Sequence, residues 1–123
     1  MPQAKAMQTR PHAALGDVVD LGHLGHYTMG DVKLERELLR MFAGQAEELR
    51  ARLRAADDDA EWKLASHTLK GAAMAVGAFA IAQAAKELEE AGRSAPEELM
   101  SALDGHLEEF RAAFAHWERQ SAA

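Results

Sequence analysis

The sequence contains no cysteine, only three prolines, and no apolar run that approaches the length of a membrane span. Without cysteine there is no disulfide framework, no thiol nucleophile and no cysteine-ligated metal site. A membrane helix needs about 18 consecutive apolar residues, and the N-terminus also lacks the apolar stretch of a secretory signal. A net charge of −6 argues against binding to a nucleic-acid backbone. These absences predict a cytoplasmic protein that binds neither nucleic acid nor membrane.

Alanine dominates what is present, with 27 of 123 residues. Alanine is the strongest helix former, and the β-branched residues that favour strands are scarce, so we expect an all-α protein. The length suits one domain. Residues 1–14 hold two of the three prolines and no periodic pattern. We therefore expect a flexible N-terminal tail over 1–14 and a single domain over 15–120.

Apolar residues recur at steps of three and four along most of the chain, which is the period of an amphipathic helix. They predict four long helices, at about 31–56, 59–77, 79–92 and from Ser94 onward. A shorter apolar group at 15–24 predicts a small helix that Gly22 and Gly25 break. Short connections between the long helices favour an antiparallel four-helix bundle with a short extra N-terminal helix.

Capping residues support these boundaries. Asp31 and Asp58 stand where N-caps are expected, and Gly77 and Gly92 stand where helices end. The first long helix is expected to bury the apolar stripe of Leu34, Leu38, Phe42, Leu49 and Leu53. The pattern thus predicts which face of each helix forms the core.

The helix at 59–77 has an outer face that is unusual for a solvated surface. With 100° per residue, His67 lies about 160° from Leu69, which is centred on the core stripe. Leu64, Gly71 and Met74 share the outer face with His67, and Lys63 and Lys70 lie at its margin. The helical repeat therefore places an exposed imidazole among apolar neighbours and cations.

The neighbours of His67 provide open space, a nearby cation and apolar surface. A mid-helix glycine costs about 1 kcal/mol relative to alanine, and Gly71 opens space one turn after His67. Lys70, three residues from His67, reaches the same region. Leu64 and Met74 are either an apolar docking patch or residues covered by the N-terminal segment. The face has the properties of a docking site that contains a nucleophile.

Residues 66–73, SHTLKGAA, followed by Gly77 and by Leu88-Glu89, resemble the signature of histidine-containing phosphotransfer (HPt) domains. The layout of about 31–119 is similar to that family. The resemblance implies that His67 accepts a phosphoryl group from an aspartyl phosphate on a receiver domain and passes it to another receiver. It also implies that Lys70 steadies the phosphoryl group and that Gly71 admits the partner's loops. We expect no intrinsic cofactor, because the family's Mg²⁺ belongs to the receiver.

Glu89 is singled out by geometry as well as by the resemblance. His67 lies 11 residues before Ala78 and Glu89 lies 11 residues after it, so a hairpin turning there brings both to one level. A carboxylate at that level would accept a hydrogen bond from one ring nitrogen and leave the other free. In the family, a basic residue near the phosphoryl group corresponds more weakly to Arg93. Gln83, on the outward face of the third long helix, is a further candidate for the docking surface.

Other functions compete with a free-standing, monomeric phosphocarrier of a multistep phosphorelay. The chain could be the phosphoacceptor module of a chemotaxis-type histidine kinase, or a helical adaptor without chemistry. The dimerisation part of an ordinary histidine kinase is disfavoured, because Thr68 stands where that family usually has an acid. We expect no ATP-binding or kinase centre in this chain. His23 and His26 lack a convincing third ligand, so we expect no metal site.

Overall fold

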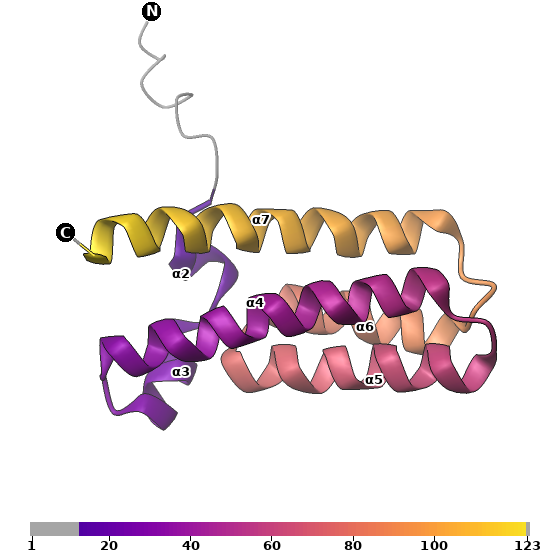
Figure 1. Cartoon of the computed structure of the whole chain (residues 1–123), viewed down its shortest axis with the longest axis horizontal. Coiled ribbons are helices and arrows are strands. Elements are labelled where there is room, and N and C mark those ends of the chain that lie inside the picture. The colour runs from indigo at the N-terminus through magenta and orange to yellow at the C-terminus, as the bar shows by residue number, and fades with distance from the viewer. Residues whose placement is uncertain (1–12, 123) are drawn as a thin grey trace, which may run out of the picture.

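The computed structural model describes residues 13–122, and every regular element within that range is a helix. The predicted tail over 1–14 therefore falls mostly outside the described residues, and Ala14 already acts as the N-cap of the first described helix. Figure 1 shows two short helices followed by four long ones. Their bounds are α2 (Leu15–Val18), α3 (Leu21–Thr28), α4 (Val32–Ala55), α5 (Asp59–Val76), α6 (Phe79–Ala91) and α7 (Glu97–Ala122).

Predicted capping residues mark the starts of α4 and α5 and the ends of α5 and α6, whereas α7, predicted from Ser94 onward, begins at Glu97. The Asp31 carboxylate accepts from the backbone N–H of Leu34, and the Asp58 carboxylate accepts from that of Glu61. At the other ends, Gly77 and Gly92 follow α5 and α6 with φ angles of 84° and 80°. Such positive φ angles favour glycine, which explains why both helices end there.

The four long helices pack around one apolar core, so the predicted all-α class is confirmed. In Figure 1 they run alongside one another with alternating direction, and α5 contacts α4 and α6 while α7 contacts α6 and α4. The most deeply buried large side chains of these helices are Leu39, Leu53, Leu69, Leu88, Leu103 and Phe110. The indole Nε1 of Trp62 donates to the backbone oxygen of Leu88 at 2.8 Å, which fixes α6 against α5.

The stripe predicted for α4 needs one correction. Leu34 is 38% exposed, whereas Leu39 is fully buried. Leu34 lies in the first turn of α4, where the helix extends past the body of the core. The remaining stripe residues are buried or packed against the core, so the error is confined to the helix start.

The N-terminal segment forms two helices where one broken helix was predicted. Val19 is extended between α2 and α3, and the Asp20 carboxylate caps α3 by accepting from the His23 N–H at 3.0 Å. Gly22 and Gly25, expected to break the helix, lie inside α3. The cap and the burial of Leu24 thus outweigh the low helix propensity of two glycines.

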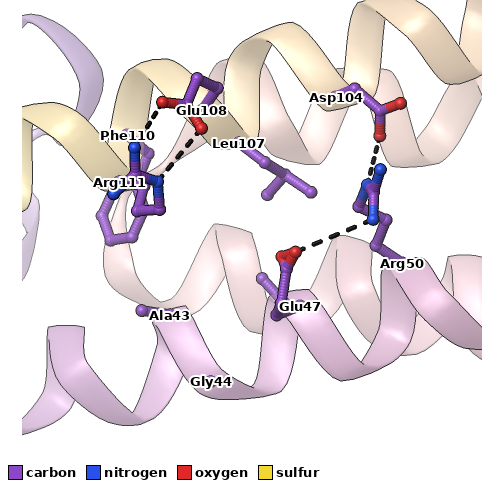
Figure 2. A pocket seen from close by; sticks show the side chains of 10 residues that line it. Ala43, Gly44, Glu47, Arg50, Asp104, Leu107, Glu108, Phe110 and Arg111 are labelled. Atoms are coloured by element: carbon purple, nitrogen blue, oxygen red, sulfur yellow. Dashed lines mark hydrogen bonds and ion pairs between the residues drawn. The ribbon is translucent and has the colours of Figure 1, made fainter.

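Ion pairs join α4 to α7 along a groove between them. Figure 2 shows Arg50 reaching from α4 to Asp104 on α7, with Glu47 on its other side and the Glu108–Arg111 pair farther along. The floor of the groove is apolar and includes the buried side chain of Phe110. None of the residues predicted for the functional site lines this groove.

Candidate functional site

His67 stands on the solvent face of α5. Its side chain is 64% exposed, whereas Leu69, two residues later, is fully buried. The helical repeat therefore placed the imidazole correctly. An exposed ring on a rigid helix is accessible to a second protein and rests on a fixed backbone.

Glu89 on α6 contacts the ring as the hairpin geometry predicted. Its Oε2 lies 3.1 Å from Nδ1 of His67. An ionised carboxylate only accepts hydrogen bonds, so this contact requires the proton to be on Nδ1. The other nitrogen, Nε2, then carries a lone pair and faces away from Glu89 as the available nucleophile.

The same carboxylate also binds Lys70. Lys70 Nζ lies 3.2 Å from the second oxygen, Oε1, so His67 and Lys70 share Glu89. Burial raises the pKa of Glu89, but the hydrogen bonds from Lys70 and His67 together outweigh burial and hold that pKa below its usual value. The carboxylate is therefore ionised at neutral pH, as the Nδ1–H tautomer of His67 requires.

Gly71 leaves open space one turn after His67. A Cβ built on Gly71 would meet no atom within 4 Å outside its own helical backbone. Nothing within the described part of the chain thus requires glycine here, although glycine weakens a helix interior. The cleared volume lies on the outer surface, where only a second molecule would occupy it.

Two apolar side chains lie exposed on this face. Leu64 is 64% exposed and Met74 is 50% exposed. The described part of the N-terminal segment, α2 and α3, leaves Leu64 and Met74 open. Residues 1–12, the rest of that segment, lie outside the described residues. Phe79, at the start of α6, is also partly exposed, but its ring contacts His23 on α3.

Gln83 and Arg93 lie outside the hydrogen-bonded group. Gln83 is exposed on α6 and its amide donates to Glu87 at 3.2 Å. Arg93, after α6, lies 3.9 Å from Asp59 at the start of α5. Asp59 is eight residues before His67, which is about 12 Å along a helix. Arg93 is therefore directed toward the end of the bundle and not toward the imidazole.

His23 has its own aromatic surroundings on α3. Its ring packs edge-to-face against Tyr27 and Phe79, with centroid distances of 5.4 and 5.3 Å. Within residues 13–122, no group of three histidine, aspartate or glutamate side chains is placed to hold a metal ion. The exposed imidazole of His67, by contrast, lies beside Glu89, which also binds Lys70.

Over the same described range, no helix has the length and apolar character to cross a membrane. Comparison with known protein families gives a match to the Hpt domain, over residues 37–113. Neither the curated proteins nor the solved structures contain a significant match. The matched range starts within α4, includes all of α5 and α6, and ends in α7.

Proposed function

Because the chain belongs to the Hpt domain family, whose members are phosphocarrier modules and not kinases, we propose that His67 is the residue that carries the phosphoryl group. Hpt domains act with receiver domains in phosphorelay signalling. The observation that carries the assignment is the 3.1 Å contact between His67 Nδ1 and Glu89 Oε2, on an imidazole that is 64% exposed. A tautomer held by a carboxylate on one side leaves a nucleophile on the other.

The transfer begins with attack of His67 Nε2 on the phosphorus of an aspartyl phosphate. The N–P bond forms as the P–O bond breaks, and the electron pair leaves with the receiver's carboxylate. The Nδ1 proton remains on the ring, so the phosphorylated imidazole is positively charged beside Glu89. In the return step, a second receiver's aspartate attacks phosphorus, the N–P bond breaks, and the ring becomes neutral again.

The neighbours of His67 assist in different ways. Lys70, 3.2 Å from Glu89, is close enough to turn its ammonium toward the transferring phosphoryl group. Gly71 gives the partner's loops room beside the ring, and Leu64 and Met74 supply exposed apolar contact area. Gln83 and Arg93 belong to the outer part of the docking surface. The Mg²⁺ needed for aspartyl chemistry is supplied by the receiver.

The wider assignment has four parts. The carrier works as a cytoplasmic monomer, folds as one domain over 15–120, has no ATP-binding centre, and passes phosphoryl groups between receivers of response regulators and hybrid histidine kinases. The absence of a membrane-spanning helix from the described residues is compatible with the first part. The single apolar core shared by α2 to α7 supports the second.

The test is phosphoryl transfer from a labelled receiver domain to the wild type and to His67→Gln. We expect label on the wild type alone, labile in acid and stable in base, as a phosphoramidate is. His67→Gln should keep the wild-type helical circular dichroism, because the ring lies off the core. Equal labelling of both proteins, or no labelling of the wild type by several receivers, contradicts the assignment and favours a helical adaptor.

A further inference from the structure

Phosphorylation of His67 would place additional negative charge beside a carboxylate that is already ionised. A phosphoryl group carries about −1.5 to −2 charges near pH 7. Glu89 is 16% exposed, and its charge is balanced by Lys70 at 3.2 Å. The phosphorylated ring keeps its Nδ1 proton and carries one positive charge beside Glu89. If Lys70 stays with Glu89 as well, the phosphoryl group has no lysine, and if Lys70 turns to the phosphoryl group, Glu89 keeps only the ring. One lysine therefore serves two anions.

Lys63 is placed to supply a second cation near the phosphoryl group. It lies on α5 four residues before His67, with an exposed side chain. Residues four apart on a helix are neighbours, with about 5–6 Å between Cβ atoms. Helical side chains also lean toward the N-terminus, so the ring of His67 lies over the turn that contains Lys63. Lys63 and Lys70 thus flank His67, one turn before and one turn after.

Arg93, another cation of this hairpin, is already paired. Arg93 lies 3.9 Å from Asp59 and is directed away from His67. Across residues 13–122, the ion pairs and side-chain hydrogen bonds include one for Lys70 and one for Arg93 but none for Lys63. Lys63 can therefore bind a new anion without giving up an existing partner.

We propose that Lys63 is a second phosphoryl-binding residue, which pairs with the phosphoryl group on His67 Nε2 while Lys70 remains shared with Glu89. This inference rests on the proposed function, because it requires phosphohistidine at position 67. It assigns the two lysines separate tasks. Lys70 keeps the carboxylate ionised and in contact with Nδ1, and Lys63 stabilises the dianionic phosphoryl group in the isolated carrier.

The experiment measures the second ionisation of the phosphoryl group by its ³¹P chemical shift as a function of pH. The full chain is phosphorylated with potassium phosphoramidate, which transfers its phosphoryl group to imidazole nitrogen and releases ammonia. His67→Gln, treated in the same way, identifies the ³¹P signal that belongs to position 67. Low ionic strength is used, because salt screens a pair of exposed charges.

Removing Lys63 should make the phosphoryl group hold its last proton more tightly. We expect Lys63→Gln to raise the phosphoryl pKa by about 0.2–0.7 pH units, the range set by an exposed ion pair. Lys63→Arg should restore the wild-type titration, because it keeps the charge. Lys33→Gln, in the first turn of α4, removes the same charge far from His67 and should leave the titration unchanged.

Two results would overturn the proposal, and they are distinguishable. A wild-type titration in Lys63→Gln means that Lys63 does not meet the phosphoryl group, while the function of His67 stands. If Lys33→Gln shifts the phosphoryl pKa as much as Lys63→Gln does, the shift reflects net charge alone. Lys63 then does not pair with the phosphoryl group. If His67→Gln keeps every ³¹P signal of the wild type, position 67 is not phosphorylated. The proposed function then fails together with this inference.

Discussion

At the scale of single residues, Glu89 organises the site. One carboxylate oxygen lies 3.1 Å from the imidazole and the other lies 3.2 Å from an ammonium group. The position and ionisation of Glu89 thus depend on both partners, and each partner is oriented by the same side chain. Changes at Glu89 should therefore affect chemistry and stability together.

Glu89→Gln should reveal this dual role through pH. The folded-state pKa of Glu89 is below its ordinary value of 4.5, so its ionisation stabilises the fold above about pH 4.5. That contribution is lost as the pH falls through the lower folded-state pKa. Free energies of unfolding from urea titrations should favour the wild type over Glu89→Gln at pH 7, and the difference should shrink below pH 4.5. A difference independent of pH would contradict the ionised network.

Gly71→Gln should separate stability from transfer. A Cβ at this position meets no atom within 4 Å outside the helix backbone, and glutamine replaces a poor helix former, so the free energy of unfolding should rise by about 0.5–1 kcal/mol. Transfer from a phosphorylated receiver should fall at least tenfold, because the side chain fills the space beside His67. Thermal unfolding and transfer rates measure the two effects.

The matched control for that substitution is Gly105→Gln. Gly105 is a helical glycine on α7 with the same open surroundings, and α7 packs on α6 and α4. Gly105→Gln should give a similar gain in stability and leave transfer unchanged. If both variants transfer at the wild-type rate, Gly71 does not clear space for the partner.

At the scale of elements, the turn between α5 and α6 joins the site to the N-terminal segment. The backbone N–H of Asp20 donates to the Gly77 oxygen at 2.9 Å, which ties the start of α3 to the end of α5. A Cβ on Gly77 would approach the Asp20 oxygen to 3.0 Å. This turn therefore requires glycine both for its φ angle and for a close backbone contact.

Gly77→Ala should be costly for both reasons. The left-handed values of φ 84° and ψ 17° cost an L-residue about 1–2 kcal/mol. The new Cβ should cost about 1–2 kcal/mol more, because the Asp20 backbone must move. Chemical denaturation measures the combined loss in the free energy of unfolding. A loss of only about 1 kcal/mol would show that the contact with Asp20 carries no strain.

Caps and periodicity predicted the long helices well, because those signals are local. Asp31, Asp58 and Gly77 act within one turn of their own positions. The helix boundaries that they set can therefore be predicted from the sequence alone. The split between α2 and α3 was missed although the Asp20 cap on His23 is local. The contact of the Asp20 N–H with the Gly77 oxygen, 57 positions away, is not visible in the sequence.

The site was predictable to the extent that it follows from the helical repeat and from the hairpin. His67, Gly71, Leu64 and Met74 share a face of one helix, and Glu89 is brought level with His67 by counting from the turn. The ion pair of Lys70 with Glu89 and that of Arg93 with Asp59 depend on side-chain directions across two helices. Counting along the chain does not provide those directions.

At the scale of the whole molecule, the ion-paired groove and the imidazole involve different helix pairs. The groove runs between α4 and α7, and the imidazole with its carboxylate lies on α5 and α6. Substitutions at Arg50 or Asp104 should therefore alter the stability of the bundle without touching the reacting atoms.

The exposure of His67 also limits how the carrier is used. On the proposed function, a single exposed imidazole accommodates one receiver at a time, so a donor and an acceptor would compete for it. An abundant acceptor receiver would slow phosphorylation of the imidazole by the donor. An abundant donor receiver would slow transfer of the phosphoryl group to the acceptor. The described residues 13–122 leave the side chain of His67 64% exposed, so a phosphoryl group bound to it would be open to water between these encounters. The lifetime of the phosphorylated carrier would then be set by the rate at which water hydrolyses the N–P bond. A signal that is not passed on within that time would be lost.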